Sequence, residues 1–327
     1  MQTQDAMSLN IAFIGVVNGL FETLKHLGRA DAETLARAAR MDSAYVTRWA
    51  DAAFAFEYLD LLHTHYSLTD KGDMMRPSHP DTLMPMAVGS VLSTHMADRA
   101  AELMRSGERP GEKILGERKT ILPWFGAMLE TTFAGLFERE ICQTIPLFQE
   151  IDRKGGTIVD LGCGNGWYLR SLARRSSHFH GIGIDGFEEN IQRATQLAQK
   201  QGLSRQLSFH KGDIKTFAPV GPVAMIAMNR ALHHVWEEKE TLFRSFRNLL
   251  DRGGTAVIWE PAWPSDPHDL RIPRNRPLAA QNLSEHVQGN HLLKPEEIAE
   301  AFREVGMNPE IYLFSDGNEA VIVGHNP

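Results

Sequence analysis

Three glycines, at positions 162, 164 and 166, directly follow a mostly apolar segment and could cradle a nucleotide-type ligand. A glycine has no Cβ, so its backbone N–H can approach a ligand closely. The segment before them, residues 157–161, is typical of a buried parallel strand. In a dinucleotide fingerprint the third glycine stands three residues after the second, and here that position is Trp167. The turn therefore predicts a nucleotide-type cofactor other than NAD.

Two acidic residues narrow the chemistry of that cofactor. Asp160 stands at the strand end, where a carboxylate would repel a pyrophosphate but could accept hydrogen bonds from a cationic amino-acid head group. Asp185 ends a second apolar segment, residues 180–185, about 20 residues beyond the glycines, where nucleotide folds place an acid on the ribose hydroxyls. The ligand is thus expected to carry both a ribose and a cationic head group.

The spacing of Asp160, Gly162, Gly164 and Gly166 resembles the first motif of the class I S-adenosylmethionine (SAM) methyltransferases. The resemblance implies SAM as the cofactor, with Asp160, Gly162 and Gly164 among its binding residues. Later segments resemble the family's following motifs in the same order. They add the cofactor-binding residues Asp185, Gly186, Asp213, Ile214 and Asn229, of which Asp213 and its neighbour would hold the adenine.

From residue 156 onward, strand and helix patterns alternate as in a doubly wound α/β sheet. Ligands bind such sheets beyond the carboxyl ends of the strands. The chain ends in two expected strands, 309–314 and 319–324, which resemble the antiparallel last strand of the class I methyltransferase sheet. We therefore predict a SAM-binding methyltransferase domain over 152–327, preceded by a helical linker and pocket roof over 83–151.

Residues 1–82 are predicted to form a separate, mainly helical domain. Asp31 and Ser43 are expected to cap its second and third helices, and 59–69 is expected to form a hairpin, which gives a winged-helix pattern. The pattern resembles the dimerisation domain of small-molecule O-methyltransferases and implies a homodimer. DNA binding is disfavoured because residues 1–75 hold ten Asp or Glu against six Lys or Arg.

Composition excludes several other classes of protein. A chain of 327 residues with a net charge of −7 favours two domains and offers no support for nucleic acid or anionic membrane as a partner. The sequence has no membrane-spanning apolar segment and no signal-peptide pattern, so a cytoplasmic enzyme is expected. Cys142 and Cys163 are the two cysteines, which leaves no disulfide framework and no thiolate metal cluster.

His233 and His234 follow Asn229 at the fourth strand end, where the acceptor should react. The related O-methyltransferases place a general-base His in a Leu-His-Asp-Trp sequence here, and this chain has Leu-His-His-Val-Trp. Either histidine could therefore be the base of a metal-free O- or N-methyltransferase. Alternatively, the pair could serve only in packing.

His286 and His291 lie in an insertion that should fold over the same strand ends. A small group of C-methyltransferases acting on 2-oxo acids resembles this chain in domain order and in the spacing from His234 to His286. The resemblance implies that these two histidines bind iron or another divalent metal ion, with His233 also at the catalytic site. Glu260 or Glu285 is an alternative ligand for completing the metal shell.

The leading hypothesis is therefore a dimeric, SAM-dependent methyltransferase that methylates C3 of a small-molecule 2-oxo acid through its enolate. Arg118 is the cation expected to pair with the substrate carboxylate, because its planar fork suits that group. A hypothesis of another class is a regulatory or scaffolding protein that keeps the fold and uses its winged helix to bind DNA or a partner.

Overall fold

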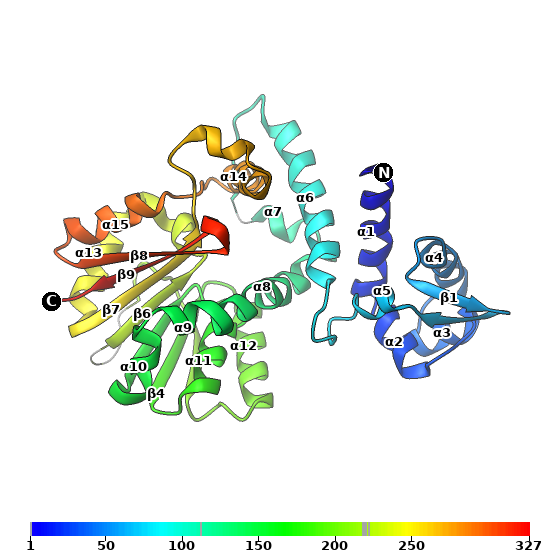
Figure 1. Ribbon diagram of the computed structural model, residues 1–327, viewed down its shortest axis with the longest axis horizontal. Helices are drawn as coiled ribbons and strands as arrows, with labels where there is room; N and C mark the ends of the chain where they lie inside the picture. The colour runs from blue at the N-terminus through cyan, green and yellow to red at the C-terminus, as the bar shows by residue number, and fades with distance from the viewer. Residues whose placement is uncertain (1, 112, 218–220, 222) are drawn as a thin grey trace. The chain divides into compact units, whose positions relative to one another are not determined.

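The computed structural model describes residues 2–111, 113–217, 221 and 223–327, and the chain divides into two compact units (Figure 1). The first unit contains Met1–Arg105 and Glu112–Thr132, and the second contains Ser106–Gly111 and Phe133–Pro327. The division falls inside the helical segment predicted over 83–151, so each unit takes part of that segment.

The first unit consists of helices and one small hairpin. Its elements are α1 (Gln2–Val17), α2 (Leu20–Leu27), α3 (Ala32–Ala39), α4 (Ser43–Ala55), β1 (Leu59–Leu62), β2 (His65–Leu68), α5 (Asp70–Asp73), α6 (Met84–Leu103), α7 (Lys113–Gly116) and most of α8 (Leu122–Leu136). The antiparallel hairpin β1–β2 confirms the one expected over 59–69.

Two capping residues set the starts of α3 and α4. Asp31 accepts a hydrogen bond from the backbone N–H of Thr34, which confirms it as the cap of α3. For α4 the expected cap, Ser43, is wrong. Asp42 accepts from the Tyr45 N–H at 2.9 Å and Ser43 is the first helical residue, because a carboxylate one residue earlier satisfies the same donor.

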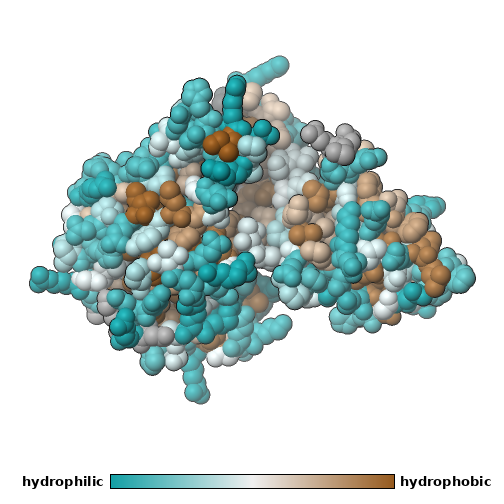
Figure 2. Space-filling model, in the orientation of Figure 1, coloured by the Kyte–Doolittle hydropathy of each residue, from teal (hydrophilic) through white to brown (hydrophobic). Residues whose placement is uncertain are grey.

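Aromatic rings hold the core of the first unit together. Phe21 makes edge-to-face contacts with Trp49 and Tyr58, with ring centroids 5.4 and 5.9 Å apart. The polar atoms of these rings also have partners, since Trp49 Nε1 donates to the Ile11 carbonyl. Figure 2 shows hydrophobic residues gathered at the end of this unit where the β1–β2 hairpin lies, and the exposed Leu61 belongs to that hairpin.

Helices α1 and α2 are bent against each other by 69°. Among the described residues no single helix is long and apolar enough to cross a membrane, and this bent pair meets the length and composition only when both helices are counted together. In the unit itself the apolar residues Phe21 and Leu24 of α2 are buried in the core.

The second unit is built on a seven-stranded sheet in the order β5-β4-β3-β6-β7-β9-β8. Its strands are β3 (Gly156–Leu161), β4 (Phe179–Asp185), β5 (Leu207–Lys211), β6 (Val223–Asn229), β7 (Leu250–Pro261), β8 (Asn308–Phe314) and β9 (Glu319–His325). Strands β3 to β7 pair in parallel, whereas β9 pairs antiparallel with both β7 and β8. This order confirms the predicted α/β sheet with an antiparallel last strand.

Helices cover both faces of this sheet (Figure 1). They are η1 (Phe137–Ile141), α9 (Cys142–Thr144), α10 (Leu147–Lys154), α11 (Trp167–Arg175), α12 (Glu188–Lys200), η2 (Leu232–Glu238), α13 (Lys239–Leu249), η3 (Pro267–Arg271), η4 (Pro273–Asn275), α14 (Arg276–Val287), α15 (Pro295–Glu304) and η5 (Ser315–Gly317). Ile158 packs with α10–α12 in one core and its neighbour Val159 packs with α13 and α15 in the other. Successive strand residues face opposite sides, so a continuous apolar strand serves both cores.

The close approach of β4 to its neighbours gives a test of this packing. A Cβ added at Gly183 would lie 2.5 Å from a Phe209 ring carbon and 2.8 Å from Cys163 Sγ. We expect Gly183→Ala to lower the free energy of unfolding by about 1–3 kcal/mol, measured by urea denaturation. The matched control is Gly186→Ala, where nothing lies within 4 Å of the added atom. Equal midpoints for the two variants would contradict the packing.

Candidate active site

The glycine turn lies between β3 and α11 at the carboxyl edge of the sheet. Gly162, Gly164 and Gly166 all have positive φ, at 74°, 53° and 75°, which favours glycine over residues with a Cβ. At Gly162 an added Cβ would also lie 2.6 Å from the Ala231 Cβ, whereas Gly164 has open space on that side. The turn therefore needs glycine for its backbone path and leaves room for a ligand beside Gly164.

Asp185 ties the end of β4 to this turn. Its carboxylate accepts hydrogen bonds from the backbone N–H groups of Gly164 and Phe187, each at 2.9 Å, and from the Asn190 amide at 3.0 Å. Gly186, next to it, has open space around the position of a Cβ. The acid predicted for the ribose thus lies beside the glycine turn with its orientation fixed.

Asp213 and Ile214 follow the neighbouring strand β5. The carboxylate of Asp213 is exposed and accepts from the Lys215 N–H at 2.9 Å. The N–H of Gly212 donates to the Asp185 carbonyl, so the two predicted cofactor segments meet at adjacent strand ends. The residues predicted to bind the ribose and the adenine therefore lie on the same side of the glycine turn.

Asp160, which is buried, and Asn229, which is partly buried, form a polar pair at the ends of β3 and β6. The Asn229 amide donates to Asp160 Oδ1 at 3.1 Å, and Asp160 is 1% exposed. Burial raises the pKa of Asp160 to about 8, although the Asn229 hydrogen bond opposes the rise. The buried oxygen of Asn229 has no hydrogen-bond partner in the described part of the chain. A buried acid beside an unpaired acceptor fits a ligand with a cationic, hydrogen-bond-donating head group.

A second polar group follows β6, where η2 begins. Nδ1 of His233 lies 2.7 Å from one Glu260 oxygen, and the other oxygen accepts from the Leu232 N–H at 2.7 Å. Glu260, on β7, is 1% exposed. A carboxylate at this distance holds the proton on Nδ1, so Nε2 of His233 is directed away from Glu260.

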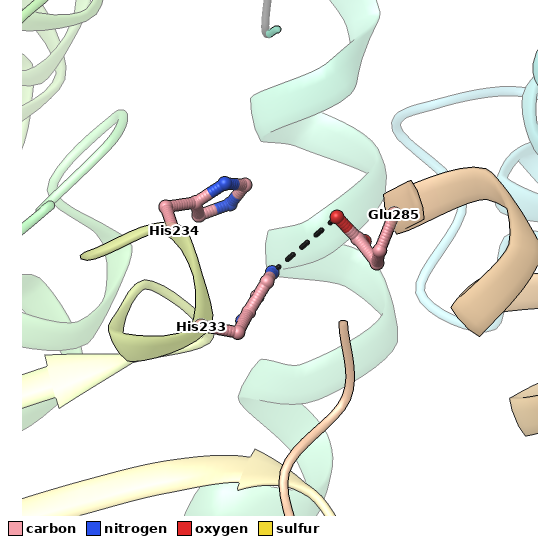
Figure 3. A group of neighbouring side chains, drawn as sticks. All are labelled: His233, His234 and Glu285. Carbon is pink, nitrogen blue, oxygen red and sulfur yellow. Dashed lines mark ion pairs between the residues drawn. The ribbon is translucent and has the colours of Figure 1, made fainter. Parts of the chain in front are cut away.

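His234 and Glu285 complete this group, as Figure 3 shows. Nε2 of His233 lies 3.5 Å from the Glu285 carboxylate on α14, and the rings of His233 and His234 are 4.1 Å apart between centroids. One ligand atom from each of the three residues lies within 4.8 Å of the others. The Asn290 amide, 2.7 Å from Nδ1 of His234, orients that ring. Two imidazoles and a carboxylate suit iron(II) and other divalent transition metals.

Burial and the charges of neighbouring residues shift the pKa of each residue in this group. Burial lowers the pKa of His233, but Glu260 and Glu285 outweigh it and raise that pKa to about 10. Burial and the neighbouring His233 lower the pKa of His234 to about 4. Burial raises the pKa of Glu285, but His233 outweighs it and lowers that pKa to about 2. His234 is therefore neutral near pH 7 and keeps a lone pair for a metal ion or a proton.

The structure brings together His233, His234 and Glu285 and leaves His286 outside the group. His286 is exposed, whereas Glu285 is buried. Successive residues on a helix point about 100° apart, so only one of the two can face the histidine pair. Glu285 thus stands where the sequence analysis expected His286, as one of the two acids that it had named as alternatives. His291 is also exposed.

Arg118 belongs to the first unit, so its role toward the substrate stays a prediction. There its Nε donates to Nδ1 of the buried His95 at 3.1 Å. Sequence reasoning also missed Asn290, which follows α14 and orients His234. The available signal was its place in the same insertion as His286.

Comparisons with known proteins concern the domain that contains the glycine turn. Residues 152–310 match the family model described as a methyltransferase domain. Sterol 24-C-methyltransferase of Aspergillus fumigatus is 27% identical over 158 residues, which are 47% of this chain and 40% of that protein. Ubiquinone biosynthesis O-methyltransferase of Roseobacter denitrificans is 27% identical over 191 residues, which are 55% of this chain and 69% of that protein.

Solved structures share the fold of the whole chain. The crystal structure of human N-acetylserotonin methyltransferase in complex with SAM matches with a TM-score of 0.74 at 17% identity, over 99% of this chain and 95% of that one. The chain spans less than half the length of the sterol methyltransferase. By name, one sequence relative is a C-methyltransferase and the other an O-methyltransferase, so the comparisons leave the acceptor atom open.

The raised pKa of Asp160 predicts that its carboxylate destabilises the SAM-free protein and favours the binding of SAM. The pKa of Asp160 is about 8 in the folded protein, above the ordinary value of 3.8. Ionisation of Asp160 therefore lowers the free energy of unfolding as the pH rises from about 4 to about 8. We expect SAM-free Asp160→Asn to match the wild type near pH 4 and to unfold at a higher temperature at pH 8. Calorimetry at pH 8 should show that the variant binds SAM more weakly. A melting difference that is independent of pH would contradict the assignment.

Proposed function

We propose that this protein, which contains a SAM-dependent methyltransferase domain at residues 152–310, methylates C3 of a small 2-oxo acid through its enolate. In the proposal, His233, His234 and Glu285 hold iron or another divalent metal ion. The observation that carries it is the approach of three ligand atoms within 4.8 Å at the carboxyl edge of the sheet. No cysteine is in the group, which suits a metal that binds substrate oxygen.

The cofactor is assigned to the glycine turn and its acids. Asp160 and the free oxygen of Asn229 would receive the ammonium of SAM, because both acceptors are buried and need a charged donor. Asp185 would hold the ribose hydroxyls, and Asp213 with Ile214 would hold the adenine. The histidine pair follows the end of β6, at the same carboxyl edge of the sheet as these residues.

The proposed reaction needs no covalent intermediate with the protein. In the proposed reaction, the 2-oxo acid would first lose a C3 proton to water to give the enolate. C3 of the enolate would then attack the methyl carbon of SAM, the carbon–sulfur bond would break, and S-adenosylhomocysteine would leave with the electron pair. A bound metal ion would supply Lewis-acid stabilisation of the enolate charge. Glu260 keeps the proton on Nδ1 of His233, and Asn290 orients His234, so both rings are held for this task.

Arg118 remains the residue proposed for the substrate carboxylate, on the basis of its guanidinium fork. A homodimer is proposed as well. It rests on the resemblance of the N-terminal domain to dimerisation domains and on large apolar side chains left exposed in the first unit, among them Tyr45, Phe54 and Leu62. The partner in the reaction is a small molecule.

One observation favours a second candidate, a metal-free O- or N-methyltransferase. A carboxylate on Nδ1 of a buried histidine leaves Nε2 to take a proton from the acceptor, which is the arrangement of a general base. His233 would be the base there, or His234, which is neutral near pH 7. The raised pKa of His233 means that this residue is protonated near pH 7, which argues against it as the base and means that a metal ion would have to displace the proton in order to bind there.

Metal content separates the two candidates. We expect protein purified without a histidine tag to carry about one metal ion by plasma mass spectrometry, and a chelator to abolish turnover of 2-oxo acids until metal is restored. His234→Ala and Glu285→Ala should each lose the ion and at least about 100-fold in turnover, with SAM affinity nearly unchanged. Full turnover of metal-free protein would refute the metal site and leave the general-base candidate.

His286→Ala is the matched control, since it changes the neighbouring, exposed residue of the same helix. It should retain metal. Loss of metal in His286→Ala with retention in Glu285→Ala would restore the ligand pair expected from the sequence.

A further inference from the structure

Arg230 stands directly before the histidine segment, in a backbone conformation that is uncommon for its residue type. Its φ is 56°, in the left-handed region, which costs a non-glycine residue free energy. Its N–H donates to the Trp259 carbonyl at 2.7 Å, which ties this bend to β7. Such a conformation persists only where the surrounding contacts hold it.

The side chain of Arg230 makes several of those contacts. Its guanidinium donates to both oxygens of Glu319 on β9, at 3.0 and 2.7 Å, and lies 4.2 Å from the ring centroid of Phe133. Trp259 Nε1 donates to the same Glu319 carboxylate at 2.8 Å. The pair is largely buried, with 13% and 11% of the two side chains exposed. These contacts fix the orientation of the Arg230 guanidinium group.

The second terminal nitrogen of Arg230, Nη2, faces α14. Nη2 of Arg230 donates to Gln281 at 3.3 Å, and the amide of Gln281 reaches Glu285, one helical turn later, at 3.5 Å. Gln288 holds the other Glu285 oxygen at 3.0 Å. Glu285 in turn faces His233. A continuous chain of polar contacts therefore runs from the last strand of the sheet to the histidine pair.

We propose that Arg230 is a positioning residue that, clamped by Glu319 and acting through Gln281, holds α14 so that the Glu285 carboxylate faces His233 and His234. The guanidinium does not touch the group itself. Its role is to fix the element that supplies the carboxylate, while Glu260 and Asn290 fix the two rings. Only the metal arm of the test below rests on the proposed function.

Gln281→Leu is the sharper test, because it cuts the link to α14 and leaves the buried Arg230–Glu319 pair intact. With cobalt(II) as the probe, we expect its affinity for the full-length protein to fall about 10-fold, as for other residues that orient a metal ligand. Arg230→Lys keeps the charge but cannot serve Glu319 and Gln281 together, so it should show a similar loss. The double variant should lose no more than either single one.

Hydrogen exchange supplies a readout that needs no metal. In both single variants the amides of Arg276–Val287 should exchange faster, while those of Pro295–Glu304 stay unchanged. Ser284→Ala, on the same helix and outside the chain of contacts, is the control and should match the wild type in both measurements. Wild-type protein that binds no cobalt would refute the metal site alone. Unchanged exchange in Gln281→Leu would overturn the positioning role.

Discussion

The site depends on the requirement that a carboxylate buried at the end of a parallel sheet be fully hydrogen-bonded. Glu260 is 1% exposed and would be costly to bury without partners. It is satisfied by His233 Nδ1 and by backbone N–H groups at the start of η2. The same bonds fix where η2 begins and which nitrogen of His233 faces outward. Nε2 of His233 in turn faces the Glu285 carboxylate on α14, at 3.5 Å.

The donor and acceptor halves of the site are built in different ways. The donor half uses backbone: positive-φ glycines, strand ends and one carboxylate that bonds to the turn itself. The acceptor half uses side chains from distant parts of the sequence, since 27 residues separate His233 from Glu260 and 56 separate His234 from Asn290.

This difference explains how much could be predicted from the sequence. The alternation of strands and helices and the places of Asp160 and Asp185 at strand ends follow from short-range spacing and apolar pattern, whereas the antiparallel last strand was expected from the resemblance to class I methyltransferases. That Glu285 rather than His286 lies beside the histidine pair does not follow from local spacing, because this depends on how α14 packs against segments distant in the sequence, as in the contact of Gln281 with Arg230, 51 residues away. The cap of α4 was predicted at Ser43 and is Asp42 in the structure. The two residues are adjacent and both residue types can cap a helix, so the sequence did not decide between them.

The proposed function requires that the methyl group of SAM be transferred to carbon. Protein incubated with SAM labelled with ¹³C in the methyl group and with a panel of 2-oxo acids such as phenylpyruvate can be followed by proton NMR. We predict a product whose labelled methyl protons are split by a proton on the adjacent C3. A labelled methyl signal without that splitting, as in an O- or N-methyl product, would contradict the account.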